Sequence, residues 1–284
     1  MRSTRQKKRF RRAIYFLAGL FLAYIVLCFW IADKVVSPRR VVPSLPKDFV
    51  VWEPVKGVPA WASPTLGEGK AKNLFIFAHG IKANRAFFED TARELQHRGY
   101  DVVILPMPGH DASPEPTVGF GTTESKLIRE TIDAAHAQHT VLVGASMGGA
   151  SCWMASDDPH VDGIVTECAF GRLEPVTHRW FNSMLPYGDI LFKPVIWIAS
   201  ARLHINPNDI NPVETAQKWN HAKPALVIEA SDDRLIPEAQ SKELASVSGA
   251  DFWRVPFVTH ANCQSVGKEY IDRVEGVMKK VLRH

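Results

Sequence analysis

A short apolar run ends in a Gly-x-Ser-x-Gly pattern near the middle of the chain. Residues 140–143 are β-branched or apolar, and the small residues at 150–156 suit a helix. Gly144 and Gly148 allow the backbone to turn sharply between these segments without a Cβ clash. The pattern predicts a strand, a tight turn and a helix, with Ser146 at the apex and at the carboxyl end of a sheet. Ser146 can act there as a nucleophile, and the alternative is that it only caps the helix.

Strand-like and helix-like segments alternate on both sides of this turn. Continuous apolar runs such as residues 74–78 are typical of strands covered on both faces. A β-prone pair at 49–52 and 58–61 predicts a hairpin or a meander at a sheet edge. We therefore expect an α/β fold with a mostly parallel central sheet flanked by helices. The expected strands are 74–78, 102–105, 140–145, 161–166, 225–229 and 252–255, and the expected helices are 84–98, 122–138, 237–247 and 266–282, with one more directly after Ser146.

The segment 171–221 interrupts this alternation and is too long for an ordinary connection. It is rich in aromatic and large apolar residues. One interpretation is a helical cap insertion that covers the carboxyl edge of the sheet and lines an apolar acyl or alkyl pocket. A second is an ordinary helical layer that buries its own aromatic residues, and a third is an apolar face that meets a bilayer. We favour the cap, because an insertion at this point lies where substrate would bind.

The N-terminus combines a basic tail with a charge-free apolar stretch. Seven of the 34 Lys and Arg residues fall within residues 1–12, and residues 13–32 carry no charge. A helix of this length extends about 30 Å, which matches the hydrocarbon thickness of a bilayer. We expect an uncleaved transmembrane helix that anchors the protein. A cleaved signal peptide is the alternative, but the apolar stretch is long and lacks a small-residue cleavage site near Cys28. A buried core helix does not suit the flanking cations.

The charge bias across this stretch predicts its orientation. The seven cations before it outnumber Lys34, Arg39 and Arg40 after it. This bias favours a single-pass protein with a cytoplasmic N-terminal tail and a body on the non-cytoplasmic side, which is the periplasm if the source is a bacterium. Residues 33–48 then form a linker, and residues 49–284 form the folded domain.

Charge and cysteine usage argue against other classes of function. Without the tail, the chain has 27 Lys and Arg residues against 30 Asp and Glu residues, so a nucleic-acid partner is not expected. No two of the four cysteines have a spacing such as Cys-x-x-Cys, so no metal site is expected. Cys168 and Cys263 are both expected near Ser146, where we favour free thiols over a disulfide.

A serine hydroxyl is a weak nucleophile at neutral pH and requires a general base, which an acid orients. In sheets of this kind the order along the chain is nucleophile, acid, histidine. Asp232 and Asp233 lie in a turn after the strand 225–229, and His260 lies in the loop after the last expected strand. Both segments fall at the sheet edge that carries Ser146. Considered alone, the aspartate could equally serve only to form the turn, and His260 could equally be a loop histidine with a structural hydrogen bond.

Several motifs together resemble the α/β-hydrolase superfamily over about residues 49–284. An apolar strand leads into His79-Gly80, and residues 121–124 read Gly-x-x-Glu, similar to the branch of monoacylglycerol-lipase-like and serine-aminopeptidase-like hydrolases. The loop 108–113 departs from the Gly-His-Gly-x-Ser-like sequence of that family, with Asp111 in place of the second glycine. The sequence Asp-x-x-Ile-Pro at 233–237 resembles the acid turn of the family and selects Asp233 over Asp232.

The resemblance implies a role for each of these residues. Ser146 attacks a carbonyl carbon, His260 transfers the proton, and Asp233 holds the imidazole. The backbone N–H groups of Met147 and Ile81 bind the oxyanion. The predicted substrate pocket includes His79, Trp180, Phe181, Met184 and Leu185, and we expect His79 chiefly to brace the oxyanion loop. Glu124 and Arg129 are expected only on a solvated helix face.

The resemblance and the anchor together predict a membrane-tethered serine hydrolase. We expect it to cleave carboxylic esters, including lipid-like or apolar acyl esters, through an acyl-enzyme intermediate and without a cofactor. A thioesterase, an amidase or a peptidase on the same fold is an alternative, and a peptidase requires a polar group such as Glu167 or Glu174 to bind the substrate amine. A second alternative is a non-catalytic, membrane-anchored binding protein on the same fold.

Overall fold

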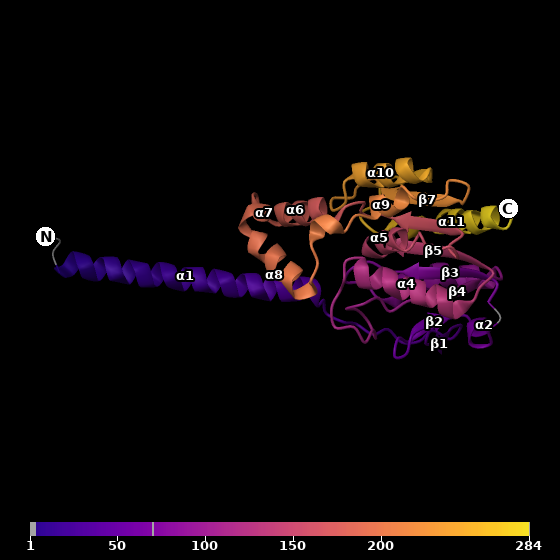
Figure 1. The fold of residues 1–284 in the computed structure, drawn as a ribbon, viewed down its shortest axis with the longest axis horizontal. Helices are drawn as coiled ribbons and strands as arrows, with labels where there is room; N and C mark the ends of the chain where they lie inside the picture. The colour runs from indigo at the N-terminus through magenta and orange to yellow at the C-terminus, as the bar shows by residue number, and fades with distance from the viewer. Residues whose placement is uncertain (1–3, 70, 284) are drawn as a thin grey trace.

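The computed structural model describes residues 4–69 and 71–283, and their strands form an eight-stranded sheet (Figure 1). The order across the sheet is β1-β2-β4-β3-β5-β6-β7-β8. The hairpin β1–β2 is antiparallel and forms one edge, and the six strands from β4 to β8 in this order are parallel. The expected mostly parallel sheet is confirmed. The strands are β1 (Val50–Trp52), β2 (Ala60–Ala62), β3 (Asn73–Ala78), β4 (Asp101–Ile104), β5 (His139–Ala145), β6 (Gly163–Glu167), β7 (Ala225–Ala230) and β8 (Asp251–Val255).

Helices cover both faces of this sheet, and their ends differ from the expected ones by a few residues. They are α2 (Pro64–Gly67), η1 (Arg85–Phe88), α3 (Glu89–His97), α4 (Thr122–Ala135), α5 (Met147–Met154), α9 (Pro212–Ala216), α10 (Glu238–Ser248), η3 (Cys263–Val266) and α11 (Lys268–Val281). In β3, Leu74 and Ile76 are buried against α4, α5, α9 and α10, whereas Phe75 and Phe77 are buried against α3 and α11. Because both faces are covered, the central strands are continuously apolar in sequence.

The segment 171–221 is divided between two layers. Helices α6 (Leu173–Met184), α7 (Gly188–Leu191) and α8 (Lys193–Leu203), followed by η2 (Pro207–Asp209), stand away from the sheet and form the cap (Figure 1). The rest of the expected insertion returns to the sheet, since Val213, Ala216 and Trp219 are buried in the same cluster as Leu244 of α10. The cap is therefore shorter than predicted, because α9 is needed to cover one face of the sheet.

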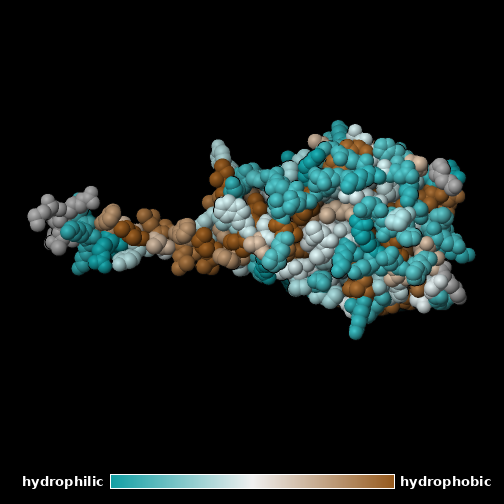
Figure 2. Space-filling view, in the orientation of Figure 1, coloured by the Kyte–Doolittle hydropathy of each residue, from teal (hydrophilic) through white to brown (hydrophobic). Residues whose placement is uncertain are grey.

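Helix α1 (Thr4–Val36) projects from the body and is longer than the predicted span (Figure 1). It contains no proline, and it ends shortly before Pro38, which disfavours helical backbone in the residue before it. Among the described residues, it is the one helix long and apolar enough to cross a membrane. Most of its apolar surface is exposed (Figure 2). Residues 1–3 of the predicted basic tail lie outside the described residues.

The expected linker 33–48 begins later in the structure, at residue 37, because α1 continues to Val36, and it is bound to the body. The carbonyl oxygen of Val36 accepts a hydrogen bond from the N–H of Val118 at 2.9 Å. The Arg40 guanidinium donates to the carbonyl oxygens of Ser113, at 2.6 Å, and Glu115. These contacts hold the end of α1 beside the loops at the carboxyl edge of the sheet.

Candidate active site

Ser146 occupies the strained turn between β5 and α5. Its backbone has φ 51° and ψ −117°. Residues other than glycine rarely adopt this conformation, and those that do are concentrated at functional sites. A Cβ atom on Gly148 would lie 1.9 Å from the carbonyl oxygen of Ala78, and one on Gly144 would lie 2.5 Å from that of Gly148. Only glycine fits these two positions. The Ser146 side chain makes no capping hydrogen bond to α5. The alternative that Ser146 only caps the helix is therefore wrong.

Three side chains that are distant in sequence meet at this turn. The hydroxyl Oγ of Ser146 lies 3.0 Å from Nε2 of His260, and Nδ1 of His260 lies 2.6 Å from Oδ2 of Asp233. Ser146 follows β5, Asp233 follows β7 and His260 follows β8, so the three meet at the carboxyl edge of parallel strands. The distances fit a hydroxyl that gives its proton to a ring oriented by a carboxylate.

The Asp233 carboxylate is fixed by its own turn. Its Oδ1 atom accepts hydrogen bonds from the backbone N–H groups of Leu235, at 2.8 Å, and Ile236, at 2.9 Å. The side chain is 1% exposed. One carboxylate therefore fills both roles considered for Asp233. Its Oδ1 atom stabilises the turn, and its Oδ2 atom contacts His260.

Two opposing effects act on the pKa of His260. Burial of the ring lowers the pKa, whereas the hydrogen bond and charge of Asp233 raise it, and the net shift is above the ordinary histidine value. Asp233 therefore favours the protonated form of the His260 ring, as the expected role of this residue requires.

The loop that carries His260 is held from behind by β6. The N–H of Cys263 donates to Oε1 of Glu167 at 2.8 Å, and the N–H of Ala261 donates to Sγ of Cys168 at 3.4 Å. Both cysteines are buried and free, as favoured from the sequence. Glu167 is buried behind the histidine loop, accepts a hydrogen bond from it, and does not line the cavity that contains Ser146.

Two backbone N–H groups are available near the hydroxyl of Ser146. Met147 begins α5, and its N–H, like that of Ile81, has no acceptor within residues 4–69 and 71–283. The side chains of Ile81, Ser146 and Met147 line the same cavity. Because free N–H groups at a helix start attract negative charge, this arrangement suits a developing oxyanion.

Two buried histidines brace the loop that carries Ile81. His79 donates from Nδ1 to the Gly80 carbonyl oxygen, at 2.9 Å, and accepts at Nε2 from the N–H of Met107, at 3.4 Å. His110 accepts at Nε2 from the N–H of Lys82 at 2.8 Å. Burial lowers the pKa of His79 to about 3 and also lowers that of His110, so both rings remain neutral. Sequence reasoning gave His79 this bracing role but missed His110.

The departure at Asp111 has a structural explanation. Asp111 adopts φ 47°, the left-handed conformation that a glycine in this place would allow. Its carboxylate receives two hydrogen bonds from the Arg85 guanidinium, at 2.7 and 2.9 Å, and both side chains are buried. Arg85 also packs over the Trp61 ring, 4.8 Å from its centroid. The pair connects the loop after β4 to the one that carries Ile81.

The prediction for Glu124 is wrong. Glu124 is buried and accepts hydrogen bonds from the N–H groups of Gly119, at 2.7 Å, and Gly121, at 2.8 Å, as part of a capping box at the start of α4. Arg129 is partly exposed and pairs with Asp157 at 2.5 Å. The helical pattern did not reveal that the loop before α4 would cover Glu124.

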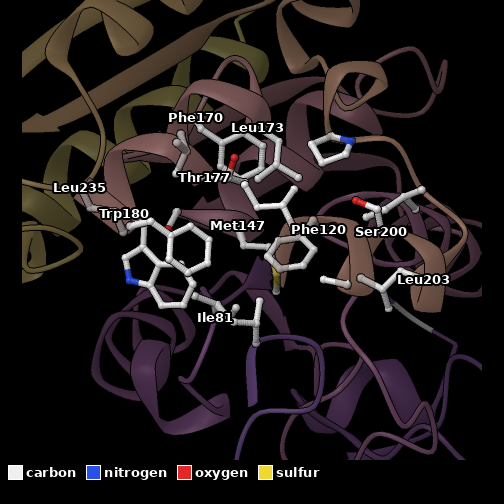
Figure 3. Close-up of a pocket in the computed structure, with 18 of the residues that line it drawn as sticks. Ile81, Phe120, Met147, Phe170, Leu173, Thr177, Trp180, Ser200, Leu203 and Leu235 are labelled. Atoms are coloured by element: carbon white, nitrogen blue, oxygen red, sulfur yellow. The ribbon is translucent and has the colours of Figure 1, made fainter. Parts of the chain in front are cut away.

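A cavity of about 310 Å³ opens between Ser146 and the cap (Figure 3). Side chains of α6 and α8 form its far wall, and loops of the body form the near wall. Its polar members include Ser146, Lys82, Thr177 and Ser200. The lining residues, all within the described part of the chain, include no aspartate or glutamate. The labelled apolar members in Figure 3 are Ile81, Phe120, Met147, Phe170, Leu173, Trp180, Leu203 and Leu235.

Two of the five predicted pocket residues line this cavity. Trp180 and Phe181 do so, whereas Met184 and Leu185 lie at the end of α6, are exposed, and do not. His79 lies behind the oxyanion loop and does not line the cavity either. The error for Met184 and Leu185 arose because hydrophobicity alone does not tell which residues of a cap helix face the cavity.

Sequence reasoning missed Val35, which lines the cavity from the last turn of α1. The predicted span ended at residue 32, and no sequence pattern indicated that α1 continues to the cavity. It also missed Phe120 and Phe170, which lie in loops without periodicity. Leu235 and Ile236 line the cavity as well, and their place beside Asp233 in the acid turn was a usable signal.

Comparison with known proteins supports the fold. Residues 73–186 match a family model described as the alpha/beta hydrolase fold. Among proteins with curated functional descriptions, none matches this sequence.

Solved structures with a similar fold share little sequence with this chain. An esterase from Pyrococcus furiosus is 18% identical with a TM-score of 0.69, over 87% of this chain and 98% of its own. A lipase-esterase related protein from Clostridium acetobutylicum is 18% identical with a TM-score of 0.55, over 80% and 99%. An enol-lactonase from Burkholderia xenovorans is 14% identical with a TM-score of 0.56, over 81% and 99%. At these identities the similarity concerns the fold.

Proposed function

Since this chain has the α/β-hydrolase fold, we propose that it is a serine hydrolase that cleaves carboxylic esters with an apolar acyl group. The observation that carries the proposal is the chain of contacts from Ser146 through His260 to Asp233, at 3.0 and 2.6 Å, beside an apolar cavity. The two candidate oxyanion donors are the N–H groups of Met147 and Ile81, two residues that line the same cavity as Ser146.

The reaction proceeds in two halves. Oγ of Ser146 attacks the ester carbonyl carbon while Nε2 of His260 accepts its proton, and the carbonyl oxygen becomes an oxyanion bound by the N–H groups of Ile81 and Met147. His260 then protonates the leaving alcohol, and an acyl group remains on Ser146. Water repeats the sequence and releases the acid. The route uses these side chains and water, with no cofactor.

The composition of the cavity favours esters over peptides. An apolar lining gains free energy by burying an acyl chain, at about 25 cal/mol per Å² of apolar surface. A peptidase that binds a substrate amine requires a carboxylate in the cavity, and the described lining has none. Glu174 pairs with His178 at 2.9 Å, and Glu167 is buried behind the His260 loop. Thioesters and simple amides remain alternatives on the same machinery.

We further propose that α1 spans a membrane as an anchor, with the N-terminus in the cytoplasm and the body on the other side. The support is its length, its exposed apolar surface and the excess of cations before residue 13. Proteolysis of cells from which any outer membrane has been removed tests this orientation, because added protease then removes the body only if it lies on the non-cytoplasmic side.

A panel of p-nitrophenyl esters of increasing acyl length tests the substrate class. We expect kcat/KM to rise from acetyl to medium-chain esters, because each added methylene buries apolar surface in the cavity. A maximum at acetyl would contradict an apolar acyl pocket. A folded protein that hydrolyses none of these esters and does not react with a fluorophosphonate would favour the alternative of a non-catalytic binding protein.

A further inference from the structure

Exposed apolar side chains are concentrated at the outer end of the cap. We call this surface the cap tip. Ile190 is 70% exposed and Trp197 is 62% exposed, values that are unusual for such side chains in water. Figure 2 shows hydrophobic surface along α1 that continues onto the part of the body where α1 joins it. The cap tip consists of Met184, Leu185, Tyr187, Ile190, Leu191 and Trp197.

Helix α8 packs against the last turns of α1. Cys28, Ala32 and Val36 follow one another at a spacing of four residues on one face of α1 and are buried against the cap. Their partners include Val195 and Ala199 of α8. The cap and the candidate span therefore form one packed unit.

The register of this contact sets the position of the cap tip along the axis of α1. At one end of α8, Arg202 pairs with Asp33 at 2.6 Å. Near the other end, the Tyr24 hydroxyl donates to the carbonyl oxygen of Leu191. Tyr24 and Asp33 are nine residues apart on α1, which corresponds to about 13 Å along the helix axis. Asp33 is the first charged residue after the apolar stretch, so it marks the outer boundary of the hydrocarbon.

We infer that the cap tip is inserted in the outer leaflet of the membrane and that the cavity receives an acyl chain from the bilayer. This inference rests on the proposed function, because it takes residues 13–32 as the span. If they cross the bilayer, α7 and the start of α8 lie beside the outer part of the span, where exposed apolar side chains contact lipid and not water.

The cavity and the charges near it agree with this placement. Val35 of α1 and Leu203 of α8 both line the cavity, so its wall is built from the unit that meets the membrane. The ammonium of Lys193 lies 5.7 Å from the centroid of the Trp197 ring, a cation–π contact that offsets part of the cost of its charge. The substrate class is then an ester with a long acyl chain that resides in the membrane.

Depth measurements on the full-length chain in phosphatidylcholine nanodiscs test the inference. Nitroxide labels are attached at Ile190→Cys, at Phe21→Cys in the span and at Leu282→Cys near the C-terminus. The protein without a new cysteine gives the background, since the four native cysteines are buried. We expect the labels at residues 190 and 21 to collide more with oxygen than with a water-soluble nickel chelate, and the label at 282 to show the reverse.

The outcomes separate this inference from the proposed anchor. A label at 190 that reports water while the label at 21 reports lipid would overturn the inference and leave the anchor intact. Water at both positions would overturn both. Shielding of residue 190 from oxygen and nickel alike would identify a second copy of the chain as the occupant, and would also overturn the inference.

A kinetic test uses Ile190→Glu, with Leu282→Glu as the matched control. We expect the variant to hydrolyse a long-chain ester in phosphatidylcholine vesicles at least about tenfold more slowly, because a charge replaces an apolar group that contacts lipid. Its rate with soluble p-nitrophenyl acetate stays unchanged, which also shows that it folds. Equal losses with both substrates, or no loss with either, would contradict the inference.

Discussion

The proposed catalytic edge of the sheet and the cap above it are held by different kinds of contact. At the edge, each functional group is fixed by short polar contacts and a defined backbone: Ser146 by its strained turn, Asp233 by two N–H groups, and the oxyanion loop by His79 and His110. The cap is held mainly by apolar packing against α1. Under the proposed function, the edge sets the reaction and the cap sets which acyl groups reach it.

The largest expected effect is at Ser146. Ser146→Ala removes the nucleophile and is expected to lower kcat for every ester by a factor on the order of 10⁴ to 10⁶, with little change in stability. Steady-state hydrolysis of p-nitrophenyl esters gives this factor, and Ser183→Ala, an exposed change in the cap, is the control. Comparable activity in the two variants would show that Ser146 is not the nucleophile.

The next effect is at Asp233 and includes a pH dependence. His260 accepts a proton only when neutral, so activity is lost as the pH falls through its pKa, which Asp233 raises. Asp233→Asn is expected to lower kcat by about 10⁴-fold and to move the acid limb of the kcat/KM profile to lower pH, because the largest effect that raises the pKa of His260 is then lost while burial still lowers it. An unmoved or upward-shifted limb would exclude Asp233 as the partner.

A third prediction concerns the buried pair behind the oxyanion loop. Arg85→Met leaves the Asp111 carboxylate buried without its partner, and we expect the free energy of unfolding to fall by about 3–5 kcal/mol. The exposed pair Lys242–Glu238 is the control, since Lys242→Met should cost no more than about 1 kcal/mol. Denaturant unfolding measures both, and equal costs would show that the buried pair does not stabilise the edge.

The smallest effect is expected in the apolar wall. Val35→Ala removes two methyl groups from the part of α1 that lines the cavity. We expect kcat/KM to fall a few-fold for medium-chain esters and to stay constant for acetyl, since only longer chains reach this wall. An equal loss for both chain lengths would indicate that α1 supports the catalytic edge, and the distinction between the two regions would weaken.

The difference between the sheet edge and the cap also explains which features the sequence could predict. The edge follows from local rules: strands end in turns, glycines permit close approach, and parallel strands bring their carboxyl ends together. Ser146, Asp233 and His260 could therefore be selected before any coordinates. Met184 and Leu185 in the cap could not be assigned correctly, because burial of a cap helix depends on how it packs.

Contacts that depend on tertiary packing also escaped prediction. Val35 lines the cavity only because α1 packs on α8, and Glu124 is buried only because the loop before α4 covers it. Neither residue carries a local signal for its place. Asp111 is intermediate: its departure from the family pattern was visible, but its partner Arg85 was not.

The most direct test of the central claim is to identify the residue that a fluorophosphonate modifies. The reagent reacts with a serine only where a base activates it, so peptide mass spectrometry of the labelled full-length protein reports on the assembled site. We predict a single adduct on Ser146, lost in Ser146→Ala and strongly reduced in His260→Ala. An adduct on another residue, or undiminished labelling of Ser146 in His260→Ala, would contradict the assignment.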